Sequence, residues 1–61
     1  MHPTELRMIA KRKRTEADAL DKACSHLDPD RRARARLEAT TLRRKAVELE
    51  MAAQRAEAVG A

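Results

Sequence analysis

The sequence predicts an all-α protein in which two helices form an antiparallel hairpin, and the hairpin self-associates into a four-helix bundle. Strong helix formers dominate both halves of the 61 residues, which include 13 alanines and no aromatic residue. One break, at Asp28-Pro29-Asp30, divides the helical pattern. Apolar residues recur at three- and four-residue spacing on both sides of that break. We therefore expect residues 1–61 to form a single helical-hairpin domain.

The first helix is expected over about residues 4–26. Pro3 suits the first helical position, and Glu5 falls in the first turn, where an acidic residue is favourable. The apolar stripe of this helix consists of Leu6, Ile9, Ala10, Lys13, Ala17, Leu20, Ala23, Cys24 and Leu27. Lys13 lies in the middle of the stripe, where a lone lysine costs stability and can determine register or oligomeric state. Its long side chain can also extend past its neighbours to solvent.

A turn is expected at residues 27–29, and a second helix over about residues 29–58. Asp28 is a good N-cap, Pro29 fits the first helical position, and Gly60 follows the last periodic residue. Because the connection is so short, an antiparallel hairpin is favoured. One long helix kinked at Pro29 is the alternative.

The second helix carries two apolar stripes. The first is a heptad seam made of Ala35, Ala39, Leu42, Ala46, Leu49, Ala53 and Ala56. The second, almost opposite, runs through Ala33, Leu37, Thr40, Arg44, Val47, Met51 and Ala58. Because a helix in an isolated hairpin needs only one apolar face, the second stripe predicts an oligomer interface at Leu37, Val47 and Met51. The alternative is that these three residues are merely exposed, as single apolar residues often are.

The size of the chain also points to association. A chain of 61 residues is near the lower limit for a self-sufficient core, and its one cysteine excludes an intramolecular disulfide. The additional apolar burial that a stable fold needs is expected to come from a homo-oligomer or from a helical protein partner. Cys24 and the absence of an N-terminal apolar segment favour a reducing, cytoplasmic location. No uncharged run approaches the ~20 residues that a transmembrane helix needs.

The charge pattern suggests an alternative partner. Lys and Arg number 14 against 10 Asp and Glu, a net charge of +4. The cations gather in three clusters: Lys11, Arg12, Lys13 and Arg14; Arg31, Arg32, Arg34 and Arg36; Arg43, Arg44 and Lys45. If the chain reverses near Asp28, Lys13 faces Arg43, and the first and third clusters converge into one basic belt. Such a belt would bind DNA or RNA phosphates electrostatically, whereas the alternative is a solvated charged surface.

Local pairing is expected to neutralise part of this charge. Spacing of i,i+4 allows pairs of Arg12 with Glu16, Asp18 with Lys22, Asp28 with Arg32 and Asp30 with Arg34. Lys11, Arg14 and Arg43 are left comparatively unpaired, and are therefore the cations most available to phosphate. Without aromatic rings the chain cannot stack on bases, so sequence recognition would depend on arginines at base edges.

No catalytic, cofactor or metal site is expected. Cys24, His26 and Asp28 are close in sequence, but helical spacing turns His26 away from the other two, and a metal needs three or four converging ligands. The single serine and single glycine provide neither a nucleophile–base set nor a phosphate loop. The sequence therefore predicts a non-catalytic helical interaction module, a regulator or adaptor acting through helix packing and oligomerisation. A nucleic-acid-binding regulator is the alternative, ahead of a membrane-surface helix, which would favour Trp or Phe.

Overall fold

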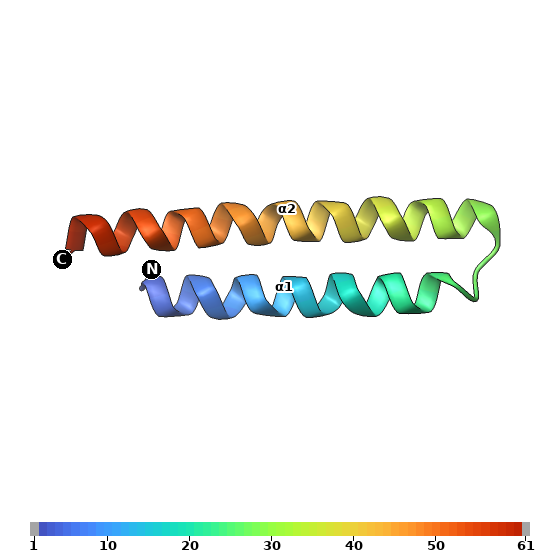
Figure 1. The fold of residues 1–61 in the computed structure, drawn as a ribbon, viewed down its shortest axis with the longest axis horizontal. Helices are drawn as coiled ribbons and strands as arrows, with labels where there is room; N and C mark the ends of the chain where they lie inside the picture. The colour runs from blue at the N-terminus through green and yellow to red at the C-terminus, as the bar shows by residue number, and fades with distance from the viewer. Residues whose placement is uncertain (1, 61) are drawn as a thin grey trace.

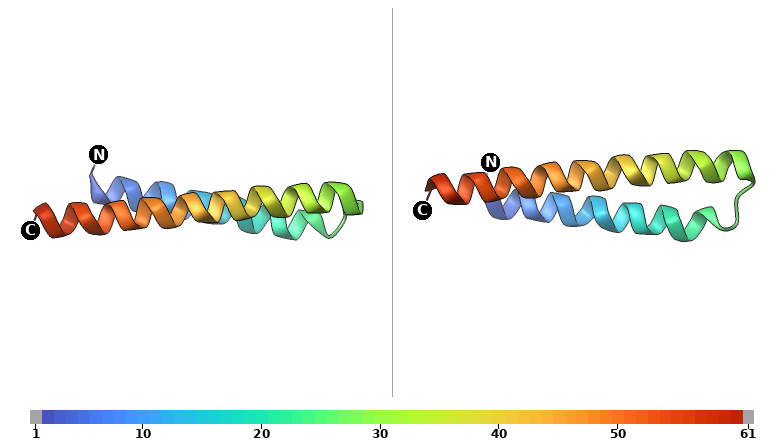
Figure 2. Two further views of the ribbon diagram at one scale, coloured as in Figure 1. Left: turned by 90° about the horizontal axis from the view of Figure 1, so that it is seen from above. Right: turned by 45° about the horizontal axis from the view of Figure 1, so that its top comes forward.

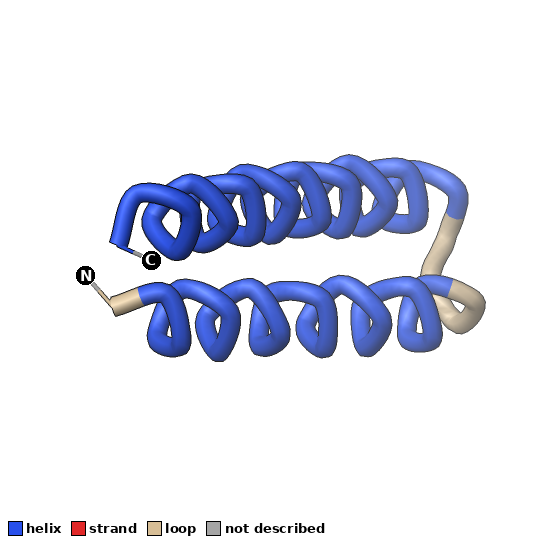
Figure 3. Tube along the Cα trace, turned by 60° about the vertical axis from the view of Figure 1, so that its left-hand side comes forward, coloured by secondary structure: helices blue, strands red, loops and turns tan. Residues whose placement is uncertain are grey.

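The computed structural model describes residues 2–60, which form two antiparallel helices joined by a short turn (Figure 1). Helix α1 spans Pro3–Cys24 and helix α2 spans Pro29–Gly60, with no strand in the described range. The hairpin measures 49 × 13 × 12 Å, and its helices cross at a shallow angle (Figure 2). The tube trace shows the chain doubling back at the turn (Figure 3). The predicted all-α hairpin is thus confirmed, and the alternative of one kinked rod is wrong.

Helix α1 begins as the sequence predicts and ends two residues earlier. Pro3 occupies the first turn, and Nδ1 of His2 accepts a hydrogen bond from the backbone N–H of Thr4 at 3.2 Å. At the other end, the N–H of His26 donates to the carbonyl of Ala23 at 3.1 Å. This hydrogen bond spans three residues instead of the four of an α-helix, and Ser25 and His26 lie in a turn outside the helix.

Asp28 starts helix α2. Its Oδ1 accepts the N–H of Arg31 at 2.8 Å, and its carbonyl accepts the N–H of Arg32 at 2.8 Å. The guanidinium of Arg32 also donates to the carbonyl of Leu27 at 3.2 Å, across the turn. The chain therefore reverses where the aspartate cap predicts it. Helix α2 continues past residue 58 and includes Gly60, which has no positive φ and so does not form a left-handed cap.

The core is a seam of small side chains between the helices. The buried residues are Ala10, Ala17 and Cys24 of α1 with Ala35, Ala39, Ala46 and Ala53 of α2. Small residues at a helix–helix contact allow the two backbones to approach closely. The remaining seam residues of α2, Leu42, Leu49 and Ala56, are half-buried. The predicted heptad seam is therefore the contact with α1, and we call the seven buried residues the alanine seam.

Enlarging a residue of the alanine seam should separate the helices. We expect Ala46→Leu to destabilise the fold by about 1–3 kcal/mol, because Ala46 has no exposed surface and the added atoms cannot be accommodated. Ala33→Leu is the matched control, because Ala33 is exposed on the same helix and should change stability by less than about 0.5 kcal/mol. Urea denaturation followed by circular dichroism at one protein concentration measures both. Equal effects of the two substitutions would contradict this description of the core.

Candidate interaction surfaces

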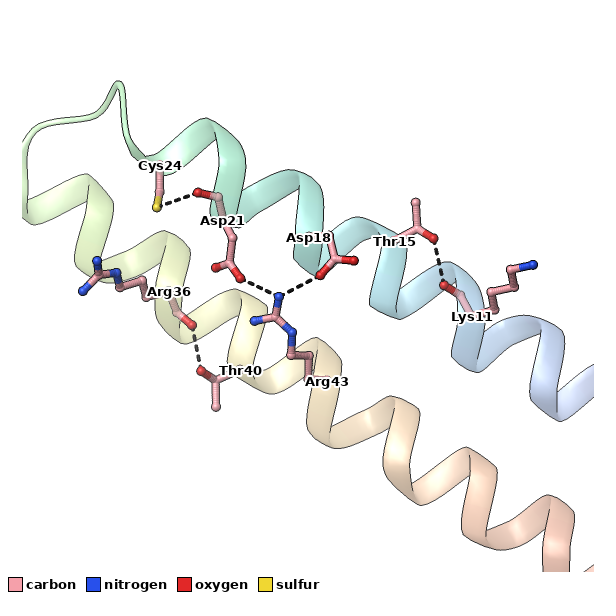
Figure 4. A network of polar contacts seen from close by, with 8 residues as sticks. All are labelled: Lys11, Thr15, Asp18, Asp21, Cys24, Arg36, Thr40 and Arg43. Atoms are coloured by element: carbon pink, nitrogen blue, oxygen red, sulfur yellow. Dashed lines mark hydrogen bonds and ion pairs between the residues drawn. The ribbon is translucent and has the colours of Figure 1, made fainter.

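One side of the alanine seam is crossed by ion pairs, and we call this side the ion-paired edge. Arg7 pairs with Glu57, Arg14 with Glu50, and Arg43 with both Asp18 and Asp21. The distances are 2.5 Å from Arg14 Nη2 to Glu50 Oε1, and 2.9 and 2.5 Å from Arg43 Nη2 to Asp18 Oδ1 and Asp21 Oδ2. Figure 4 shows the Arg43 guanidinium reaching from α2 to the two aspartates on α1. Each of these pairs joins one helix to the other.

The ion pairs change the acidity of their members. Hydrogen bonds from Arg14 lower the pKa of Glu50 below its ordinary value of 4.5, against a desolvation effect that raises it. The pKa of Arg14 is raised by the same hydrogen bonds, and that of Arg43 by its bonds to Asp18 and Asp21. All these side chains are about 40% exposed or more, so solvent screening keeps each pair weak.

The expectation that Arg14 and Arg43 are comparatively unpaired is wrong. Among the described residues, the four expected i,i+4 ion pairs do not form either: Arg12 with Glu16, Asp18 with Lys22, Asp28 with Arg32 and Asp30 with Arg34. Spacing of i,i+4 considers only partners within one helix, whereas Arg14 and Arg43 reach carboxylates across the seam. Arg14 and Arg43, from the first and third basic clusters, both lie on the ion-paired edge, where the charge of Arg43 opposes the rise in the pKa of Arg14. The carboxylates of Glu50, Asp18 and Asp21 are paired with them there, which makes this edge a mixed-charge surface instead of an uninterrupted basic belt.

The other cations of the predicted phosphate surface divide into three groups. Arg31 and Lys45 make local pairs with Asp28 and Glu48, at 3.9 and 3.7 Å. Lys13 and Arg32 are half-buried, and Nε of Arg32 is buried without a hydrogen-bond partner. The third group is exposed and makes no ion pair with any of the described residues: Lys11, Arg12, Arg34, Arg36 and Arg44.

The other side of the alanine seam carries large apolar side chains, and we call it the leucine face. Its large apolar residues are Leu6, Ile9 and Leu20 of α1, Leu27 of the turn, and Leu42 and Leu49 of α2, and all six are half-buried. Leu20 lies three residues after Ala17, whereas Arg14 lies three residues before it. Because three residues fall short of a full turn, these two side chains flank Ala17 on opposite sides. The same spacing sets Leu49 and Arg43 on opposite sides of Ala46.

A groove on the leucine face joins the two helices. Its volume is about 480 Å³, and it is lined by Glu16, Ala19, Leu20, Ala23, Glu38 and Leu42. Leucine and alanine side chains make up the apolar part of this lining, and the two glutamates add negative charge to it. Half-buried Lys13 belongs to the same side of α1 as Leu20. The leucine face, though not the groove itself, thus combines apolar surface with charges of both signs.

The residues predicted as an oligomer interface lie elsewhere. Leu37, Val47 and Met51 are 69%, 44% and 53% exposed. Each is one or two positions from an alanine of the seam, at least 100° around α2, and so faces away from α1. Sequence reasoning missed the leucine face as a free surface because it assigned the leucines of the seam to contacts within the hairpin. The sequence did contain a signal for this free surface, namely the many alanines that alternate with these leucines in the heptad seam.

The described residues bring together no three His, Cys, Asp or Glu side chains that could hold a metal ion. Cys24 is buried, and its Sγ donates a hydrogen bond to the carbonyl of Asp21 at 3.1 Å. Neither helix, over residues 2–60, has the length and apolar character needed to cross a membrane. The surfaces that remain are the leucine face, the outer apolar residues of α2 and the exposed cations.

Removing Arg14 should raise the pKa of Glu50. We expect Arg14→Gln to move this pKa towards its ordinary value, because the hydrogen bonds and positive charge of Arg14 hold it down. A lowered carboxyl pKa stabilises the fold at pH values above 4.5, and that stability is lost as the pH falls through the lowered pKa. NMR titration of the side-chain carboxyl carbons measures the shift. Arg12→Gln is the control, and an unchanged Glu50 titration in Arg14→Gln would contradict the pairing.

Comparison with known proteins identifies no relative. No protein-family model, no curated protein and no solved structure matches this chain. Function is therefore inferred from the surfaces described above, starting with the leucine face.

Proposed function

We propose that this chain is a non-catalytic interaction module, a small regulator or adaptor that acts in the cytoplasm through helix packing and oligomerisation. Its contact surface is the leucine face. The observation that supports this is the size distribution of the core: the buried residues are alanines and one cysteine, whereas the six large residues of the leucine face are only half-buried. Full burial of such a side chain contributes about 1.5–3 kcal/mol, and the hairpin alone realises only part of it.

The position of the charges supports the same surface. The ion pairs between the helices lie on the opposite side of the alanine seam, where Arg7, Arg14 and Arg43 are engaged with carboxylates of the hairpin itself. A helical partner placed on the leucine face would meet the charges of Lys13, Glu16 and Glu38, but it would break no ion pair between the helices. A partner placed on the ion-paired edge would have to compete with existing pairs, which is costly.

Site-specific photo-cross-linking in cells tests this function. A photo-reactive amino acid at position 42 should form covalent adducts with a protein partner, because Leu42 lines the groove of the leucine face. The matched control is position 41, where Thr41 is exposed on the same helix turn and should give none. Position 51 tests the outer face of α2 in the same experiment. Adducts at position 51 with none at position 42 would contradict the proposed surface.

The second candidate is a regulator that binds DNA or RNA through phosphate contacts. The five exposed cations of the third group above support it, three of them on α2: Arg34, Arg36 and Arg44. These cations, and not Arg14 or Arg43, are free to neutralise phosphate. Binding of this kind would be independent of sequence and would weaken steeply with salt, because it is driven by counterion release.

Fluorescence anisotropy with duplex DNA and duplex RNA tests the second candidate. We expect the combined substitution of Arg34, Arg36 and Arg44 by Gln to weaken binding to unrelated sequences. The slope of log affinity against log salt should fall by about 0.9 for each DNA phosphate that these arginines would otherwise neutralise. Arg14→Gln with Arg43→Gln is the control, because these side chains are occupied by carboxylates and should change the slope little. Absence of binding by the unmodified chain at low salt would eliminate this function.

A further inference from the structure

We infer that the occupant of the leucine face is a second copy of this chain, so that two hairpins bury the face between them. The inference rests on the proposed function and specifies its partner. The two copies are related by a twofold axis that crosses both helices. Helix α1 then lies antiparallel to α1 of the other copy, and α2 to α2, which gives a four-helix bundle.

The exposed area of the hairpin supports a partner of this size. The chain exposes 4849 Å². A compact monomer of 6.9 kDa exposes about 4,000 Å², so the hairpin has an excess of about 850 Å². One partner in a stable interface of standard size buries about 800 Å². One further hairpin is therefore enough to bring the exposed area per chain to that of a compact protein.

The order of residues on α2 supports self-pairing. The half-buried Leu42 and Leu49 lie one heptad apart, and the positions one heptad before and after them are alanines, the buried Ala35 and the half-buried Ala56. A twofold axis midway between the two leucines places Leu42 beside Leu49 of the second copy. Large residues then meet at the centre of the interface, and only small ones lie towards its ends. An isologous interface requires this kind of self-complementary surface.

Light scattering of the purified chain after size-exclusion chromatography tests the inference. We expect twice the 6.9 kDa mass of one chain, and a monomer for Leu42→Asp. The control is Leu37→Asp with Met51→Asp, which adds charge to the outer face of α2 and should leave the dimer intact. Dissociation of this control with survival of the Leu42→Asp dimer would overturn the inference.

A second measurement covers the case in which Leu42→Asp fails to fold. In a Cys24→Ala background, Lys45→Cys places a thiol near the proposed axis and should form an intermolecular disulfide on mild oxidation. Arg44→Cys, next to Lys45 but about 100° around α2 towards the outer side, should form little. A monomeric chain without this disulfide overturns the second copy as occupant. If such a chain still forms adducts at position 42 with another protein in cells, the proposed function survives without the second copy. If it forms none there, the proposed function and the second copy as occupant are both overturned.

Discussion

The close approach of two helices on alanine is the constraint on which the rest of this structure depends. Ala17 and Ala46 are small and have no exposed surface, so the two helices lie close together at these residues. Larger neighbouring side chains do not fit between the helices and lie on the two sides of the seam. On one side these neighbours are leucines, which remain half-buried. On the other side they are long charged side chains, which reach the facing helix. Both candidate surfaces are therefore consequences of the same small residues.

The sequence was sufficient for features that depend on nearby residues. Asp28 caps α2 through a hydrogen bond to Arg31, three positions away, and the seam of α2 follows from its heptad spacing. The ion-paired edge could not be predicted in the same way. Arg14 and Glu50 are separated by 36 positions, so their meeting depends on the register of the helices across the turn. A count of i,i+4 neighbours contains no information on that register.

The candidate interface shows a different limit of sequence reasoning. Heptad positions specify the direction of a side chain around its helix, but they do not specify how much of it the facing helix covers. Heptad spacing assigns Leu42 and Leu49 to the contact with α1, which leaves Leu37, Val47 and Met51 as the predicted interface. The structure leaves Leu42 and Leu49 half-buried, because contact between alanines covers only the nearer part of a leucine on their flank. Burial depends on the distance between helices, which periodicity does not encode.

The ion-paired edge has a consequence for the uniqueness of the fold. A seam of nearly identical alanines repeating every seven residues would accept a helix displaced by one heptad almost as well. The charges of the ion-paired edge would not accept such a displacement, because their signs would no longer match. Displacement in one direction sets Arg14 against Arg43, and displacement in the other sets Asp21 against Glu50, so either shift creates a like-charge repulsion. Weak ion pairs that add little to stability thus select a single alignment from several that the alanines alone would permit.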